Sequence, residues 1–383
     1  MIKMNLEECR KEIDSIDKEL VALFARRMAV AKDVAAYKKE TGMAIFDSER
    51  ERKLLEKVEE NAGEEFGDYA RRLYSSILDL SRNYQAKEIA PQSTLAESIK
   101  KAVETTPRLF PEKAIVACQG VEGAHSSVAC QKIFEKPSIM YCQTFEAVFQ
   151  AVESGLCDYG VVPLENSTAG SVTQIYNLMS EHKFSIVRSK KMQIQHNLLA
   201  KKGVKIGDIK EVFSHPQALS QSSEFLKELG VKVTECANTA IAAKMVAESE
   251  RNDIGALSSE SCATQYSLDI VKPNVQNTKN NYTRFICFSK NLEIYPGADR
   301  TSLLIRTPHK AGALYSVMAN FYSLGVNIIK LESRPVPESD FEFMFYFDLD
   351  VSVYSEKLPM VISQLEYSLG EQNIKYLGSY REV

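Results

Sequence analysis

Two cationic residues, Arg27 and Lys38, lie on the apolar stripe of the first predicted helix. At 100° per residue Arg27 falls at the centre of that stripe, and Lys38 lies about 20° away and roughly 16 Å further along the axis. A charge on a buried stripe is costly unless a group of opposite charge meets it. The two residues therefore predict an enclosed site for an anion. The apolar residues of the stripe are Ile13, Ile16, Leu20, Leu23, Val30, Ala31 and Val34.

Polar residues recur on the apolar faces of the two helices that follow. Ser81 and Gln85 are one turn apart on one such face, and Arg50 and Glu51 are each in line with leucines or valines of another. Arg10 lies about 80° from the stripe of its own helix and is better placed to serve a neighbouring chain. A simpler interpretation is that the long Arg and Lys side chains lie at the edge of each stripe and extend from there to water. That interpretation suits a single residue better than the whole set.

Three helices must position these side chains. Residues 1–90 contain no proline, and Gly42, Gly63 and Gly67 fall at the apparent breaks. We expect helices over about 5–40, 48–61 and 68–85, the first roughly 50 Å long. Three helices of such unequal length bury a full core most easily as a dimer. A proline-containing linker with a helical piece is expected to follow over residues 91–112.

From residue 113 onward, short apolar runs bounded by glycine alternate with helical segments, as in AIVACQG followed by SSVACQKIF. This alternation predicts an α/β unit over residues 113–290, with two lobes and a ligand cleft between them. Three polar clusters stand out: LENSTAGSV after a strand, SHPQALSQ before a helix, and NNYTRF leading into a strand. We expect Ser167, Thr168 and Ser171, with Gly170, to expose backbone N–H groups to a carboxylate at a helix start. Ordinary turn and cap chemistry is the alternative.

The last segment, residues 300–383, has the order strand, helix, strand, strand, helix, strand. TSLLIRT, VNIIKLESR, FEFMFYFDLDV and IKYLGSY are the strands, and GALYSVMANFYSLG and EKLPMVISQLEYSLG are the helices. This βαββαβ order in about 80 residues predicts an α+β, ferredoxin-like unit.

Composition narrows the possible functions. The 383 residues carry a net charge of −4, so no general basic field favours nucleic acid. No apolar run is long enough to span a membrane, and the charged N-terminus does not resemble a signal peptide. The eight cysteines are scattered, and the five histidines have no neighbour at metal-ligand spacing. We therefore expect a cytoplasmic protein with reduced thiols, no metal and no cofactor, whose partners are small molecules and copies of itself.

The first unit resembles the all-helical chorismate mutase family, on the segments RKEIDSIDKELVALFARRMAVAKDVAAYKKETG, DSERERKLL and SRNYQ. The resemblance implies a [3,3] rearrangement of chorismate to prephenate in an entangled dimer. It assigns the two substrate carboxylates to Arg27 and the partner's Arg10, and the ether oxygen to Lys38 and Gln85. It also implies that Asp47 and Glu51 bind the ring hydroxyl, and that Arg50 and Ser81 complete the pocket. A pericyclic reaction needs a held conformer and cations near the oxygen that gains charge, and these residue types supply both.

The second unit resembles the prephenate dehydratase family, on GVEGAHS, LENSTAGSV, SHPQALSQ and TRF. The resemblance implies loss of water and CO₂ from prephenate to leave phenylpyruvate, with Thr283 as the donor that helps hydroxide leave. Arg284 would organise the site or bind a carboxylate. The other residues implied in the cleft are Ser126, Glu165, Asn166, Ser167, Thr168, His215, Gln217 and Phe285. The chain departs from the common pattern at Val121, His125 and Ser222.

The third unit resembles the ACT regulatory domain, on GALY at the start of its first helix and ESRP at the end of its second strand. The resemblance implies an L-phenylalanine site, and a purely structural dimerisation module is the alternative. Helix-start N–H groups and a glycine that permits close approach suit an amino acid. The implied binding residues are Gly312, Ala313, Leu314, Glu332, Ser333, Arg334 and Pro335.

Together the resemblances imply a three-domain enzyme of phenylalanine biosynthesis. They predict an all-α mutase domain, a two-lobed α/β dehydratase domain like periplasmic binding proteins, and an α+β ACT domain. Residues 1–90, 91–112, 113–290 and 300–383 would be the mutase, linker, dehydratase and regulatory segments. An arogenate-preferring dehydratase and a solute sensor without catalysis are the alternatives. The polar residues on the helical stripes and the TRF cluster argue against a sensor.

Overall fold

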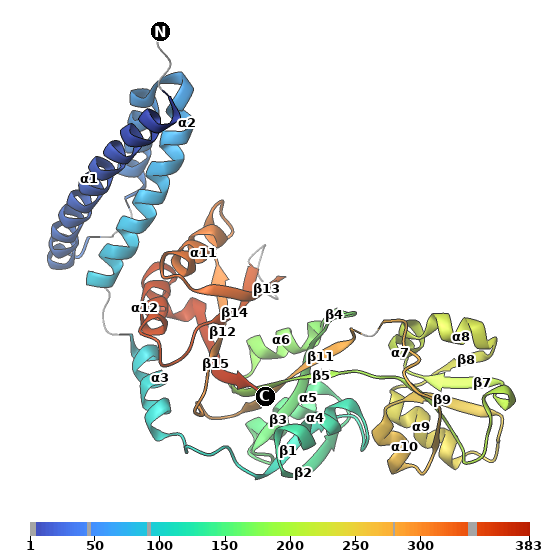
Figure 1. The fold of residues 1–383 in the computed structure, drawn as a ribbon. Helices are drawn as coiled ribbons and strands as arrows, with labels where there is room; N and C mark the ends of the chain where they lie inside the picture. Colours follow the sequence, from blue (N-terminus) through green and yellow to red (C-terminus); the bar gives the residue numbers. More distant parts are fainter. Residues whose placement is uncertain (1–4, 44–46, 90–92, 279, 336–342) are drawn as a thin grey trace.

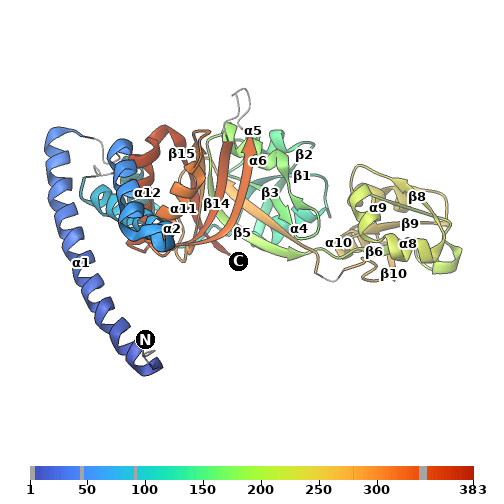
Figure 2. The same ribbon diagram turned by 90° about the horizontal axis from the view of Figure 1, so that it is seen from above.

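The computed structural model describes residues 5–43, 47–89, 93–278, 280–335 and 343–383. The chain forms a helical unit, an α/β unit of two lobes and a C-terminal α+β unit. The helical unit and the α/β unit extend from opposite sides of the C-terminal unit (Figures 1 and 2). No described helix is long and apolar enough to cross a membrane.

The first helix, α1, spans Leu6–Thr41. The Asn5 side chain accepts hydrogen bonds from the backbone N–H groups of Glu7 and Glu8 at its start, and Gly42 ends it in the left-handed conformation. Within the described chain only Ala31 and Ala35 of this helix are buried, whereas Ile13 and Leu20 are 55% and 52% exposed. Most of the predicted apolar stripe is therefore not covered by its own chain.

The second helix, α2, spans Ser48–Ile89 and consists of two arms that meet at Gly63, where φ is 75° and ψ is 176°. The arms run antiparallel, because Arg71 pairs with Glu59 and Arg82 pairs with Glu51. The predicted break at Gly63 is confirmed, but Gly67 stays inside the second arm. A Cβ at Gly67 would lie 3.1 Å from the carbonyl oxygen of Glu59, so glycine permits the close approach of the arms.

The predicted linker contains a packed helix, α3, over Thr94–Thr105. Ser93 caps its start, and Ile99 and Ala102 are buried in the core of the C-terminal unit. The hydroxyl of Thr106 accepts a hydrogen bond from the backbone N–H of Ile294 at 3.0 Å. This segment is thus fixed against the body of the protein.

The first lobe of the α/β unit contains a central sheet with helices that bury its apolar residues. Strand β3 pairs with β1 in parallel and with β11 in the antiparallel sense, and β11 pairs in turn with β5. The elements are β1 (Lys113–Gln119), α4 (His125–Ile133), β2 (Lys136–Cys142), α5 (Phe145–Glu153), β3 (Tyr159–Asn166), β4 (Gly170–Ser171), α6 (Thr173–Glu181), β5 (Ser185–Gln193) and β11 (Tyr282–Ser289).

The second lobe has its own five-stranded sheet, in the order β10-β6-β9-β7-β8. The chain enters it after β5 and returns to the first lobe through β11, so two strands connect the lobes. Its elements are β6 (Asn197–Ala200), η1 (Ile206–Asp208), β7 (Glu211–Ser214), α7 (Pro216–Gln221), α8 (Ser223–Leu229), β8 (Lys232–Glu235), α9 (Thr239–Glu248), β9 (Ile254–Ser258), α10 (Glu260–Gln265) and β10 (Asp269–Lys272).

The C-terminal unit has the predicted βαββαβ order, and its sheet continues that of the first lobe. Strand β15 pairs in parallel with β5, giving the order β13-β14-β12-β15-β5-β11-β3-β1-β2. A Cβ at Gly378 would lie 2.3 Å from the carbonyl oxygen of Ile186, so glycine is needed at this junction. The elements are β12 (Arg300–Thr307), α11 (Ala313–Ser323), β13 (Asn327–Pro335), β14 (Phe343–Asp350), α12 (Lys357–Leu369), η2 (Glu371–Asn373) and β15 (Ile374–Glu382).

Candidate active sites

A cavity of about 710 Å³ lies between α1 and the two arms of α2. Arg27 and Lys38, the two cations on the apolar stripe of α1, both line it. Apolar residues form part of its wall, among them Leu23, Val30 and Leu78. The polar residues named from the sequence that line this cavity are Arg27, Lys38, Asp47, Arg50, Glu51, Ser81 and Gln85.

Local structure explains how these side chains are directed into the cavity. Lys38 lies in the last turn of α1, and Asp47 immediately precedes α2, where its carboxylate accepts a hydrogen bond from the backbone N–H of Arg50 at 3.0 Å. Burial lowers the pKa of Lys38 from its ordinary value, and the negative charges of Asp47 and Glu51 oppose this effect. Lys38 is therefore partly shielded from water, with charged groups of both signs nearby, and its ammonium group can donate a hydrogen bond to an oxygen atom in the cavity.

Ser81 and Gln85 form the neutral side of the cavity. Both side chains are buried, and Nε2 of Gln85 donates to Oγ of Ser81 at 3.2 Å. Oε1 of Gln85 is buried and has no hydrogen-bond partner among the described residues. The one-turn spacing noted in the sequence thus brings the two groups into direct contact.

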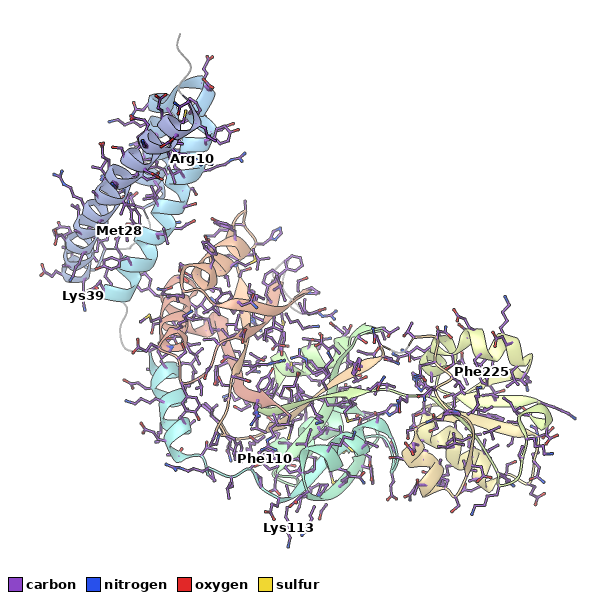
Figure 3. The ribbon with its side chains drawn as sticks, in the orientation of Figure 1. Arg10, Met28, Lys39, Phe110, Lys113 and Phe225 are labelled. Atoms are coloured by element: carbon purple, nitrogen blue, oxygen red, sulfur yellow. The ribbon has the colours of Figure 1, made fainter. Side chains whose placement is uncertain are left out.

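Arg10 does not line the cavity. It lies near the start of α1, at the opposite end of the helix from Lys39 (Figure 3), whereas the residues of α1 that line the cavity run from Leu23 to Lys38. This placement agrees with the expectation that Arg10 does not serve the pocket of its own chain.

Arg82 lines the same cavity and was not identified from the sequence. Its guanidinium is ion-paired with Glu51 on the opposite arm of α2 and with Asp79 one turn before it. Only the Asp79 to Arg82 spacing of three residues is visible in the sequence. The pairing with Glu51 depends on the reversal at Gly63.

The hydroxyl of Thr283 is at the centre of a second candidate site, at the start of β11. The Thr283 side chain is 8% exposed, and its Oγ1 accepts a hydrogen bond from Nδ2 of Asn166 at 2.9 Å. The antiparallel register of β3 and β11 pairs these two residues directly. Two clusters chosen from the sequence, LENS and TRF, therefore meet.

A chain of amide and imidazole groups connects Thr283 to the second lobe. Nδ2 of Asn166 also donates to Oδ1 of Asn281 at 2.7 Å, and Nδ2 of Asn281 donates to Oε1 of Gln221 at 2.9 Å. The same Gln221 oxygen lies 3.0 Å from Nε2 of His196. Asn281 and Gln221 belong to the motifs NNYTRF and SHPQALSQ, so the sequence pointed to their segments without naming them individually. His196 lies outside both motifs, and no sequence signal pointed to it.

The turn after β3 differs from its prediction. The backbone N–H groups of Thr168 and Ala169 donate to Oδ1 of Asn166, and that of Ser167 donates to the carbonyl of Tyr282. Helix α6 begins only at Thr173. The prediction of exposed N–H groups at a helix start is therefore wrong, because the turn satisfies its own donors.

Arg284 and Glu165 project from the opposite face of the sheet to Thr283 and Asn166. Nε of Arg284 lies 2.7 Å from Oε1 of Glu165, and Nη2 lies 2.5 Å from Oδ2 of Asp348 in the C-terminal unit. Glu165 is also ion-paired with Lys330 of β13. Burial lowers the pKa of Arg284, but the surrounding acidic groups, with Tyr346 and Asp348 foremost, together raise it more, so the pKa lies above its ordinary value. Arg284 thus binds protein carboxylates, and the expectation that Glu165 lines the cleft is wrong.

Four other residues named for the cleft lie away from the hydrogen-bond chain around Thr283. Phe285 is 2% exposed and packs in the core of the first lobe, so its assignment to the substrate site is wrong. His215 caps α7, with Nδ1 accepting from the backbone N–H of Gln217 at 3.2 Å. Ser126 is buried in the first turn of α4. Within the described chain, no hydrogen bond joins Ser126, His215 or Gln217 to Thr283.

The two motifs of the C-terminal unit lie where the sequence placed them. Gly312 precedes the first residue of α11 with φ of 83°, and Glu332–Pro335 end β13. Oε2 of Glu332 accepts a hydrogen bond from Oγ of Ser171 at 2.7 Å, beside the turn after β3. Arg334 pairs with Glu332 at 2.9 Å. The second motif is thus in direct contact with the α/β unit, and the remaining named residues, Ala313, Leu314 and Ser333, lie on the same two elements.

Family models match both catalytic units. The chorismate mutase type II model matches residues 9–86, and the prephenate dehydratase model matches residues 116–293. These spans coincide with the helical unit and with the α/β unit.

Curated relatives cover nearly all of the chain or about four fifths of it. The bifunctional chorismate mutase/prephenate dehydratase of Aquifex aeolicus (strain VF5) is 31% identical over 378 residues, 98% of this chain and 97% of the relative. The arogenate dehydratase/prephenate dehydratase 2 of Arabidopsis thaliana is 32% identical over 315 residues, 79% of this chain and 81% of the relative.

Solved structures are similar to about two thirds of the chain. A quorum-quenching acylase, GqqA, has a TM-score of 0.64 and 31% identity, and the match covers 70% of this chain and 98% of that one. Prephenate dehydratase from Arthrobacter aurescens in complex with L-Phe has a TM-score of 0.64 and 24% identity, with 70% and 90% covered.

Proposed function

Because the chain belongs to the bifunctional chorismate mutase/prephenate dehydratase family, we propose that it catalyses two consecutive reactions of phenylalanine biosynthesis. The helical unit rearranges chorismate to prephenate, and the α/β unit converts prephenate to phenylpyruvate. Seven residues chosen from the sequence line one cavity in the helical unit, and this observation supports the first activity most strongly.

The mutase reaction requires binding and electrostatics rather than a nucleophile. Arg27 holds a substrate carboxylate, for which a guanidinium is well suited. Lys38 and Gln85 donate to the ether oxygen, where negative charge grows as the C–O bond breaks. Asp47 and Glu51 bind the ring hydroxyl, and Arg50 and Ser81 complete the pocket. Because charge on the ether oxygen is largest in the transition state, Lys38 contributes more to kcat than to binding.

The mutase site is completed in a homodimer. The exposed apolar stripe of α1, including Ile13, Ile16 and Leu20, supports this proposal, since an unpartnered stripe of this length is unfavourable in water. The second carboxylate of chorismate is held by the partner subunit's Arg10. A cytoplasmic location follows from the proposed pathway.

The dehydratase reaction needs one weak proton donor, because aromatisation drives the loss of CO₂ and hydroxide. Thr283 donates to the departing hydroxyl. Asn166 orients the Thr283 hydroxyl by donating to its oxygen, which leaves the hydroxyl proton for the substrate. Ser126, His215 and Gln217 contribute to the walls of the cleft once the two lobes enclose the substrate.

The C-terminal unit is an ACT domain that binds L-phenylalanine and inhibits the enzyme. The GALY and ESRP segments supply the site. A solved structure of similar fold, the Arthrobacter aurescens prephenate dehydratase, was determined in complex with L-Phe. The contact of Glu332 with Ser171 supports a direct effect on the dehydratase unit, because a ligand at ESRP would disturb it. Inhibition requires that phenylalanine binds two states of the enzyme with different affinity.

Arogenate is the second candidate substrate of the α/β unit, since the Arabidopsis relative carries that name. The attached mutase, whose product is prephenate, favours prephenate. The test is to supply the full chain with chorismate alone and follow its loss and the appearance of phenylpyruvate. Conversion to phenylpyruvate supports the proposal, whereas loss of chorismate with accumulation of prephenate would refute the second activity. Competition between prephenate and arogenate, judged by kcat/KM, decides between the substrates.

A further inference from the structure

The second arm of α2 contacts the C-terminal unit beside the GALY segment. The hydroxyl of Tyr315, the last residue of that segment, donates to Oδ2 of Asp79 at 3.1 Å. These residues are 236 positions apart, and the contact joins the regulatory helix α11 to the mutase helix α2 (Figure 1). Asp79 does not line the mutase cavity, but it lies one turn before a residue that does.

The contact continues into the mutase cavity through Arg82. Nη2 of Arg82 is hydrogen-bonded to Oδ1 of Asp79, the other oxygen of the carboxylate that Tyr315 contacts. Nη1 of the same guanidinium is hydrogen-bonded to Glu51. The side chains of Arg82, Asp79 and Glu51 are 27%, 17% and 18% exposed, so they are largely shielded from solvent.

We propose that Arg82 is a positioning residue of the mutase site, and that Tyr315 of the regulatory unit sets its position through Asp79. This inference rests on the proposed mutase function. Arg82 holds the carboxylate of Glu51 in place and neutralises it, while Asp79 and Tyr315 hold Arg82. The mutase pocket is therefore connected to the segment that begins the regulatory helix.

Arg82 affects chorismate binding because its positive charge balances the negative charge of Glu51 in the mutase cavity. Chorismate carries two carboxylates, so an uncompensated Glu51 in the same cavity would repel it. Such repulsion, acting over a few ångströms to about 8 Å in a partly shielded site, would weaken the binding of chorismate about tenfold. Removal of the Arg82 charge would consequently raise the KM for chorismate. Loss of the Tyr315 contact leaves the charge but loosens its geometry, so its effect would be smaller.

The alternative is that these groups form an ordinary surface network with no influence on the reaction. Tyr315 is itself 53% exposed, and exposed ion pairs often contribute little to stability. The alternative predicts that substitutions change stability but leave mutase kinetics unaltered. The chain offers a matched control, because Tyr322 lies on the same helix α11 and is 84% exposed.

The test compares initial rates of chorismate loss for the full chain and for Arg82→Gln, Arg82→Lys, Tyr315→Phe and Tyr322→Phe. We expect Arg82→Gln to raise the KM for chorismate about tenfold with a smaller change in kcat, and Arg82→Lys to recover most of it. Tyr315→Phe should raise KM about threefold, and Tyr322→Phe should not. Turnover of added prephenate, measured on each preparation, verifies that the rest of the protein is folded.

Three results would overturn the proposal. Equal kinetic loss in Arg82→Gln and Arg82→Lys would indicate a structural role, and identical KM values for Tyr315→Phe and Tyr322→Phe would remove the connection to the regulatory unit. Additive effects of Arg82→Lys and Tyr315→Phe in the double variant would also do so, since groups in one network are coupled. Failure of the unsubstituted chain to consume chorismate would instead refute the mutase function itself.

A regulatory measurement extends the same test. With L-phenylalanine added, the mutase KM of the unsubstituted chain should change, and Tyr315→Phe should reduce that change while the dehydratase response persists. Equal mutase responses in the two proteins, or none in the unsubstituted chain, would overturn the role of Tyr315.

Discussion

Nη2 of Arg284 lies 2.5 Å from Oδ2 of Asp348, so a strand of the dehydratase unit and a strand of the C-terminal unit share a buried ion pair. Asp348 is fully buried, and its Oδ1 accepts hydrogen bonds from the hydroxyls of Ser302 at 2.5 Å and Tyr380 at 3.2 Å. Thr283, the neighbour of Arg284 in β11, projects from the other face of the strand. One strand thus carries both the proposed proton donor and an ion pair to the C-terminal unit.

Substitution of Asp348 by asparagine should lower the free energy of unfolding by up to about 3–5 kcal/mol, because the buried guanidinium of Arg284 loses one of its two carboxylate partners. The remaining partner, Glu165, is shared with Lys330. Urea denaturation followed by circular dichroism measures this loss. The double variant Arg284→Met/Asp348→Leu should be more stable than the single variant, since it removes both charges. A double variant that is less stable than Asp348→Asn would contradict the explanation.

Replacement of Thr283 by alanine should reduce dehydration of prephenate by about 100-fold or more, because the proton donor is lost. Mutase turnover by the same preparation should be retained, as the two sites lie in separate units. Thr283→Ser keeps a hydroxyl at the end of the Asn166 contact and should recover part of the activity. Unchanged prephenate turnover in Thr283→Ala would refute the assigned role.

Lys38→Ala should lower the mutase kcat by about 100- to 1,000-fold, with KM changed by less than about threefold. The reason is that the ether oxygen carries most of its negative charge in the transition state. Burial lowers the pKa of Lys38 from its ordinary value of 10.5. As the pH rises, Lys38 should therefore lose its proton, and the mutase its activity, at a pH below 10.5. Equal losses in substrate affinity and in kcat would exclude a donor that acts mainly in the transition state.

The role of the partner subunit's Arg10 is tested by mixing two inactive variants, Arg10→Ala and Arg27→Ala. A heterodimer of these chains contains one site with both arginines and one with neither. After random exchange about half of the dimers are mixed, so about a quarter of the unsubstituted mutase activity should return. Absence of recovery, with subunit exchange verified by differently tagged chains, would show that Arg10 serves its own chain or none.

His125 should make the folded protein sensitive to acid. Burial, with a smaller effect of the neighbouring His196, lowers the pKa of His125 from 6.5 to about 4. Below pH 6.5 the unfolded chain binds a proton at this residue that the folded chain does not, so stability falls as the pH falls towards 4. The contribution between pH 6.5 and 4.5 is at most about 2–3 kcal/mol. His125→Phe should show a smaller loss over this range in urea denaturation, and an identical loss would contradict the assignment.

The sequence alone determined the order of the units and most of the polar groups of the mutase cavity. Arg27 and Lys38, or Ser81 and Gln85, share a helix, and the regular helical repeat therefore decides which side chains face the same way. The breaks at Gly42 and Gly63 and the βαββαβ order of the last unit follow from equally local signals. For these features no information about distant residues is needed.

Tertiary structure alone decided which distant groups meet. Arg82 reaches Glu51 only because α2 reverses at Gly63, and β15 continues the dehydratase sheet because Gly378 permits close approach to Ile186. Alternation along β3 and β11 could separate Glu165 and Arg284 from Asn166 and Thr283. This alternation could not tell which face of the sheet meets the C-terminal unit, because that depends on how the two units pack against each other.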